Sequence, residues 1–191
     1  MSEILETVES SDDCILYPQD ETYIRTESNN RRIWSPIGVS PILERNATHN
    51  GINAIGATEV LKNFDTVIDI YHSQKSITSV EIKAFLEHLL EINPGKKVYL
   101  VWDDARTHTS TMIQQYLKVN EKRLITINSP KYSLGMNHQE NLWNRLKALL
   151  FRPSARCCIE ELMADIFDIY CEFNSSINGV YLLTYAKSFL V

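Results

Sequence analysis

The pattern of apolar and polar positions predicts five strands, at residues 14–17, 52–58, 64–71, 98–102 and 123–127. The first is a short apolar run that we expect Pro18 to end. The second and third are β-rich runs joined by a short polar link, which is typical of a hairpin. The fourth is apolar throughout and therefore predicts a strand covered on both faces.

Apolar residues at helical spacing predict four helices between and after these strands. One begins at Ser79 and ends at the stop signal Asn93-Pro94-Gly95. The others are predicted at residues 109–119, from about 137 to 150 and from about 159 to 173. Residues 1–12 are predicted to be a frayed acidic leader.

The order of these elements describes an α/β sheet with crossover connections. In such sheets, binding sites form beyond the carboxyl ends of parallel strands. Asp20 and Asp103 lie just past predicted strands, and Glu140 lies in the first turn of a predicted helix, where a carboxylate also favours the helix dipole. Acidic residues at such positions are costly to keep without a cation or another partner. The three acids are therefore candidate functional residues.

Composition is that of an ordinary globular protein of one domain. The chain has 191 residues, of which 44% are hydrophobic and 23% charged. It has no apolar run long enough to cross a membrane and no signal-peptide pattern at its start, so we expect a cytoplasmic protein that does not contact membranes. Its four cysteines have no CxxC spacing, and a zinc site is not expected.

Charge is unevenly distributed along the chain. The net charge of −5 argues against a protein whose whole surface binds nucleic acid. Residues 1–20 carry six acids and no base, whereas residues 118–156 carry eight bases and two acids, one of which is Glu140. A basic stretch around a carboxylate suits a phosphodiester substrate, although solvated helix faces would give the same pattern.

Three carboxylates on separate elements suit metal-dependent phosphodiester cleavage. Two Mg²⁺ ions can activate a water and stabilise the leaving oxygen, and hard cations of this kind prefer oxygen ligands. The sequence contains no Gly-x-Ser-x-Gly elbow, P-loop or His-Glu-x-x-His motif that would indicate another chemistry.

Each candidate residue also has a structural interpretation. Asp20 could be a turn residue, and Glu140 a helix-start carboxylate. Asp104 could cap the turn that follows Asp103, and His108 could cap or pack. His138 could be an exposed loop residue. Asp65 and Asp69 are alternative acids to Asp20, although strand alternation could leave Asp69 facing solvent.

Three ordered blocks resemble DDE transposases of the mariner superfamily, on its prokaryotic insertion-sequence branch. Residues 103–108, Asp-Asp-Ala-Arg-Thr-His, resemble that family's Asp-Asn-Ala-x-x-His signature. Residues 130–147 are similar to its second signature, and 36 residues separate Asp103 from Glu140, close to the family's spacing. The block from Asp20-Glu21 through Trp34-x-Pro36-x-Gly38 matches its first block.

The resemblance implies an α/β, RNase H-like fold with a mixed five-stranded sheet flanked by helices. It implies that Asp20, Asp103 and Glu140 are the catalytic metal ligands for two Mg²⁺ ions, for which Mn²⁺ would substitute. The implied reaction is hydrolysis at transposon ends followed by strand transfer to target DNA. Further residues are implied to contact DNA or to support the metal ligands: His108, Lys131, Asn137, Asn144 and Lys147.

The sequence departs from the family pattern at a few positions. Asp104 stands where the family usually has Asn, which adds negative charge beside Asp103. Leu134 and His138 replace usual prolines, which would loosen the chain before Glu140. We expect no helix-turn-helix DNA-binding module ahead of Asp20, so either a separate DNA-binding polypeptide would supply it or the chain would be a truncated or repurposed copy. Paired active sites are usual for this chemistry, and a homodimer is expected.

Two rival interpretations follow from the same residues. The chain could be an inactive or repurposed transposase relic that acts as a DNA- or protein-binding module, an alternative motivated by the departures and by the expected lack of a DNA-binding module. It could also be a general RNase H-like nuclease, which would cleave RNA–DNA hybrids and ignore transposon-end sequence.

Overall fold

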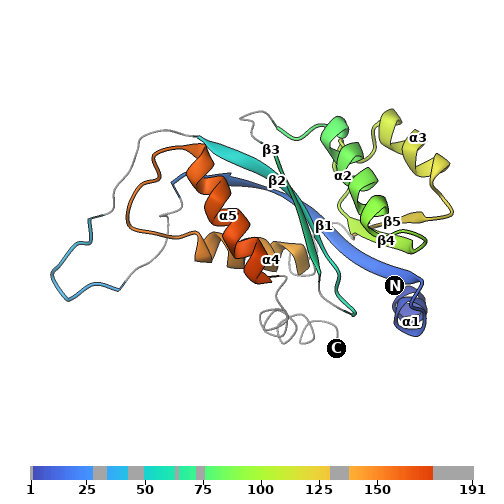
Figure 1. Cartoon of the computed structure of the whole chain (residues 1–191), viewed down its shortest axis with the longest axis horizontal. Coiled ribbons are helices and arrows are strands. Elements are labelled where there is room, and N and C mark those ends of the chain that lie inside the picture. The colour runs from blue at the N-terminus through green and yellow to red at the C-terminus, as the bar shows by residue number, and fades with distance from the viewer. Residues whose placement is uncertain are drawn as a thin grey trace.

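A mixed five-stranded sheet, in the order β3-β2-β1-β4-β5, forms the centre of the protein (Figure 1). The computed structural model describes residues 2–27, 34–42, 50–62, 65–71, 76–129 and 138–173. The strands are β1 Cys14–Arg25, β2 Gly51–Thr58, β3 Thr66–Tyr71, β4 Lys97–Trp102 and β5 Leu124–Asn128. All five strands expected from the sequence are present, and β2 and β3 form the predicted antiparallel hairpin.

Strand β1 is longer than the sequence predicted and has two different partners. Cys14–Pro18 pairs with β4 in parallel, and Gln19–Arg25 pairs with β2 in antiparallel. The prediction that Pro18 ends the strand is therefore wrong. Pro18 is the last residue in register with β4, at the point where the partner changes, and there the missing N–H interrupts neither ladder.

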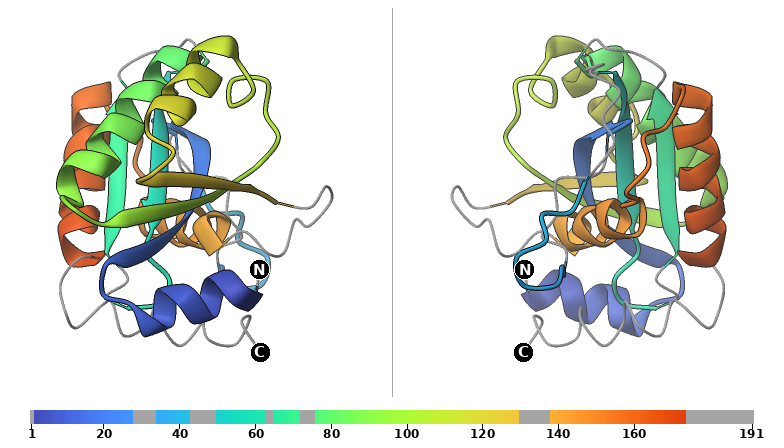
Figure 2. Two further views of the ribbon diagram at one scale, coloured as in Figure 1. Left: turned by 90° about the vertical axis from the view of Figure 1, so that its right-hand side faces the viewer. Right: turned by 90° about the vertical axis from the view of Figure 1, so that its left-hand side faces the viewer.

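Four helices cover the two faces of the sheet, with α2 and α3 on one face and α4 and α5 on the other (Figures 1 and 2). Their bounds are α2 Ser79–Ile92, α3 Thr111–Val119, α4 His138–Leu149 and α5 Ile159–Phe173. The apolar stripe predicted for α2 is buried, and a capping box between Thr78 and Glu81 fixes its start. Figure 2 also shows the strong twist between the hairpin and the β4–β5 half of the sheet.

A fifth helix, α1 Ser2–Ser10, replaces the frayed leader expected from the sequence. Val8 is fully buried and packs with Cys14, Leu16 and Tyr99 in a core of its own beneath β1 and β4. This helix was not predicted from the sequence because most of its residues are polar or acidic. A narrow apolar stripe on one face is enough to pack it against the sheet.

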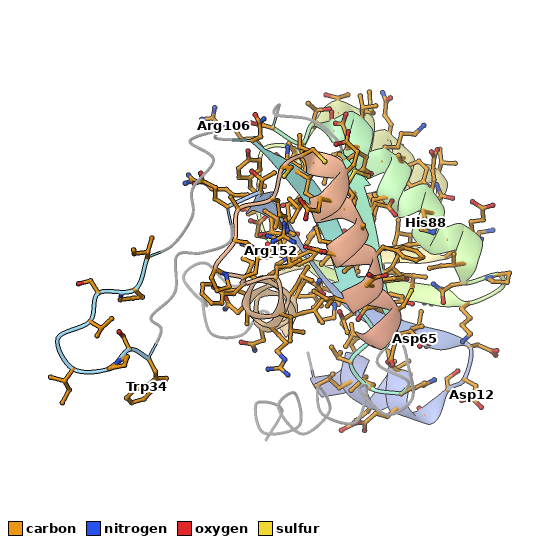
Figure 3. All side chains as sticks on the ribbon, turned by 60° about the vertical axis from the view of Figure 1, so that its left-hand side comes forward. Asp12, Trp34, Asp65, His88, Arg106 and Arg152 are labelled. Atoms are coloured by element: carbon orange, nitrogen blue, oxygen red, sulfur yellow. The ribbon has the colours of Figure 1, made fainter. Side chains whose placement is uncertain are left out.

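Residues 34–42 extend away from the sheet (Figures 1 and 3). Trp34, Ile37 and Ile42 on this segment are exposed by more than 90%. Among the residues that the structure describes, no helix is long and apolar enough to cross a membrane.

Replacing Val8 by alanine tests the docking of α1. We expect the free energy of unfolding to fall by about 1–3 kcal/mol, because the change removes buried methyl groups and leaves a cavity. Denaturant unfolding measures the difference. Glu6→Ala, an exposed position on the same helix, is the control and should change stability by no more than about 0.5 kcal/mol. Equal effects of the two substitutions would mean that α1 is not docked through Val8.

Candidate functional site

Asp20 lies within β1 rather than after it, two residues beyond the change of partner at Pro18. Its backbone is paired with Gly56 of β2. Continuing the parallel register by two residues brings Asp20 level with Asp103, which directly follows β4. Strand pairing alone therefore places these two acids at the same end of the β1–β4 ladder.

Helix α4 approaches the sheet closely above Gly56. A Cβ atom at this position would lie 2.6 Å from Gln139 Nε2 and 2.6 Å from two ring carbons of Trp143. Gln139 and Trp143 are buried on α4, and Gln139 Oε1 accepts a hydrogen bond of 2.8 Å from the Thr58 hydroxyl of β2. Because Glu140 follows Gln139 directly, this contact fixes where the first turn of α4 meets β1.

Lys147, two helical turns after Glu140, links α4 to the Asp20 face of β1. Its Nζ donates a hydrogen bond of 2.6 Å to Thr22 Oγ1. Burial lowers the pKa of Lys147, while the charges of Asp20 and Glu140 act to raise it. The ammonium group is therefore a counter-charge to both acids.

The raised pKa of Asp20 is the main electrostatic property of the site. Burial, followed by the negative charges of Glu21, Asp103 and Glu140, raises the pKa of Asp20 to about 7. The charges of Asp103 and Glu140, the other two acids expected from the sequence, thus act on Asp20, although they come from the end of β4 and from α4. A carboxyl group in this position favours a proton or a cation.

His108 connects Asp103 to a fourth acid, Glu21, on the opposite face of β1 from Asp20. His108 Nε2 lies 2.9 Å from Glu21 Oε1, and Nδ1 lies 3.0 Å from Asp103 Oδ1 and 3.1 Å from the Asp103 carbonyl oxygen. The imidazole ring is buried and stacks on Trp102, with ring centroids 4.3 Å apart. His108 therefore packs against Trp102 and also joins Glu21 to Asp103.

Both ring nitrogens of His108 face oxygen acceptors, which favours the doubly protonated ring. Burial acts to lower its pKa, but the hydrogen bond and charge of Glu21, together with Asp103, outweigh burial and raise it. Burial likewise acts to raise the pKa of Glu21, but hydrogen bonds from His108 and Gln19 bring it below the usual value.

Asp103, not Asp104, caps the turn that follows β4. The Asp103 carboxylate accepts a hydrogen bond of 3.0 Å from the backbone N–H of Ala105. Asp104 instead accepts one of 3.1 Å from Asn128 Nδ2, and Asn128 Oδ1 in turn accepts from the Trp102 indole. The capping role considered for Asp104 in the sequence is therefore wrong.

The two alternative acids lie elsewhere. Asp69 of β3 is 2.8 Å from His88 Nδ1 of α2, so it is paired rather than simply facing solvent. Asp65 is exposed just before β3 (Asp65 and His88 are labelled in Figure 3). Neither contributes to the shift in the pKa of Asp20.

Several residues implied by the family resemblance can be placed only in part. Asn144 is exposed on α4, one turn after Glu140. Lys131 and Asn137 lie outside the described residues, as does the side chain of His138. Within the described part of the chain, no group of three or more His, Cys, Asp or Glu side chains is arranged to hold a metal ion. A hollow of about 230 Å³ opens beside Glu21, Thr22 and Asn53.

Much of the basic stretch predicted to face a phosphodiester is used inside the fold. Arg123 donates to the carbonyl oxygens of Leu90 and Asn93. Arg156 is buried and pairs with Asp165 at 2.7 Å, and Arg152 pairs with Glu161. The exposed bases of this stretch, among the described residues, are Lys118, Lys122 and Arg145.

A mixed five-stranded sheet with helices on both faces, and acids on β1, after β4 and on the helix beyond β5, defines an RNase H-like domain. The chain belongs to the DDE superfamily endonuclease family, whose model matches residues 16–162. No curated protein matches the sequence.

Solved structures of the Mos1 mariner transposase share this fold. The Mos1 paired-end complex with Mn superposes with a TM-score of 0.68 at 10% identity, covering 98% of this chain and 56% of that one. The paired-end complex with the left transposon end gives 0.65 at 12% identity, covering 97% and 58%. The Mos1 catalytic domain alone gives 0.59 at 10% identity, covering 97% and 85%. The chain thus spans less than two thirds of the transposase in the complexes.

The crowding around Asp20 should appear in the pH dependence of stability. A folded-state pKa of about 7, above the unfolded value of 3.8, means that stability is lost as pH rises from about 4 through 7. We expect Asp20→Asn to raise the free energy of unfolding of the metal-free protein at pH 8 by about 2 kcal/mol, a value reduced for solvent screening, with the two proteins converging near pH 4. Asp168→Asn, an exposed carboxylate on α5, is the control; a parallel offset at every pH would contradict the assignment.

Gly56→Ala tests the close approach of α4. The added methyl group overlaps Gln139 and the Trp143 ring, and we expect a loss of about 1–3 kcal/mol in the free energy of unfolding. The same substitution in a Trp143→Leu background should cost less, because the ring atoms in its way are gone. Equal losses in both backgrounds would show that the contact does not set the distance between α4 and β2.

Proposed function

We propose that this chain is the catalytic domain of a DDE transposase, which cleaves DNA strands at transposon ends and transfers them to target DNA. Family membership and the Mos1-like fold support the class of reaction. The single observation that carries the proposal to residues is the raised pKa of Asp20, about 7, which burial causes first and to which the charges of Glu21, Asp103 and Glu140 add.

Asp20, Asp103 and Glu140 would hold two Mg²⁺ ions, for which Mn²⁺ would substitute. The chemistry of the donor set fits because all three side chains offer carboxylate oxygens, which hard cations prefer, and because a cation would offset the raised pKa of Asp20. Their arrangement among the described residues does not yet form a metal-binding group, so the side chains would have to draw together around the ions. When bound, such ions supply an activated water and stabilisation of the leaving oxygen. Two solved Mos1 paired-end complexes are those with Mn and with Mg, which supports the same cations here.

The basic and amide side chains of α4 would bind the DNA backbone and balance its negative charge. Lys147, now bonded to Thr22, would offer its ammonium group to a DNA phosphate once cations balance Asp20 and Glu140. Asn144 and Arg145 are exposed on α4 beside it and would contact the DNA backbone. We also propose that a second copy of the chain and a separate DNA-binding polypeptide take part.

Asp103→Asn provides the direct test. We expect the parent chain to nick supercoiled plasmid DNA with Mg²⁺ or Mn²⁺ and not with EDTA, and the variant to lose at least about 100-fold in rate, because a ligand worth several kcal/mol is removed. Asp168→Asn is the matched control and should keep the parent rate. Circular dichroism checks that each variant is folded.

The same assay separates the rival functions. Equal metal-dependent rates in parent and Asp103→Asn would overturn the assigned site. DNA binding without cleavage in any metal would favour a relic that acts as a binding module. Efficient cleavage of RNA–DNA hybrids would favour a general RNase H-like nuclease.

A further inference from the structure

Asp103 has little around it to fix the position of its carboxylate. The side chain is 63% exposed, although a metal ligand must be held in one orientation. Two contacts restrain it, the Ala105 N–H at 3.0 Å and His108 Nδ1 at 3.0 Å from the same oxygen, Oδ1. Both leave the second carboxylate oxygen, Oδ2, clear of these donors.

His108 itself is held rigidly. Its side chain is 2% exposed, and the ring lies nearly parallel to Trp102, with an interplanar angle of 5°. Stacking fixes the plane of the ring but not its rotation within that plane. The rotation is set by the hydrogen bonds at the two nitrogens, of which Nε2 points to Glu21.

The Glu21 carboxylate is held in place to accept that hydrogen bond by a second donor, Gln19. Gln19 Nε2 donates to the same Oε1 atom at 2.9 Å, from the neighbouring position on this face of β1. Strand alternation places the Glu21 side chain on the face of β1 opposite Asp20, although its charge still acts on Asp20. The chain of contacts therefore runs from Gln19 through Glu21 and His108 to Asp103.

We propose that Glu21 is a positioning residue that acts through His108 to fix the Asp103 carboxylate for metal binding. A carboxylate that orients a histidine, which in turn orients a ligand, is the arrangement by which residues outside a metal's own ligands tune its affinity. Glu21 itself touches neither the cation nor DNA. The inference rests on the proposed function, because it requires Asp103 to be a ligand.

A double-mutant cycle on Mn²⁺ affinity tests the proposal. Mn²⁺ binding to the full chain is measured by isothermal titration calorimetry and electron paramagnetic resonance for parent, Glu21→Ala, His108→Ala and the double variant. We expect each single variant to weaken binding by about 10–100-fold. The double variant should bind no more weakly than His108→Ala, because Glu21 acts only through the ring.

Two further variants make the result specific. Glu21→Gln keeps an oxygen that can accept from His108 Nε2, so it should recover much of the affinity lost in Glu21→Ala and remains informative if the alanine variant does not fold. Glu91→Gln removes an exposed acid of α2 and should bind Mn²⁺ like the parent.

The outcomes separate this inference from the function on which it rests. Parent-like Mn²⁺ affinity in Glu21→Ala, alongside a loss in Asp103→Asn, would overturn the positioning role and leave the metal site standing. A Glu21 effect of equal size with and without His108 would also overturn it, because Glu21 would then act by charge alone. If the parent binds no Mn²⁺, or Asp103→Asn binds as the parent does, both proposals fail.

Discussion

The burial of Asp20 among other carboxylates at the end of the β1–β4 ladder is the constraint on which this structure depends. Burial is the main cost of a charge on Asp20, and the charges of Glu21, Asp103 and Glu140 add to that cost. Lys147 lies on the α4 face of β1, and His108 lies on the α2 face, where it joins Glu21 to Asp103. The charges of Asp20 and Glu140 act to raise the pKa of Lys147, and Glu21 and Asp103 act to raise the pKa of His108.

The rest of the fold keeps these charges together. The close contact over Gly56 fixes α4 against β2, and stacking on Trp102 fixes His108 against β4. The arginines of the C-terminal half were expected to attract a phosphodiester, but most of them make contacts inside the fold. Arg123 joins α2 to the start of β5, and Arg156 joins the end of β1 to α5. The positive charge beside the acids is consequently local and comes mainly from Lys147.

Strands and helices could be predicted because each leaves a short local pattern, whereas the three acids as metal ligands stay a prediction. The hairpin, the stripe on α2 and the apolar β4 were found from spacing alone. The prediction that Pro18 ends the first strand was wrong because the strand changes partners there. A proline is tolerated at such a point, whereas it would interrupt a continuous ladder with one partner. Helix α1 was missed because its acidic composition resembles that of an unstructured leader, whereas the burial of Val8 is visible only in the folded structure. Glu21 was adjacent to Asp20 in the sequence, but its role depends on His108, 87 residues away, a separation that no local pattern reveals.

The change of partner at Pro18 has a consequence for how the protein folds. The β1–β2–β3 part consists of neighbours in sequence and can form by local pairing, whereas the β1–β4 ladder closes only after the crossover through α2. Asp20 belongs to the first part, Asp103 to the second, and Glu140 arrives later still with α4. A partly folded chain would therefore hold its acids apart, so the divalent-cation binding proposed above would require the completely folded chain.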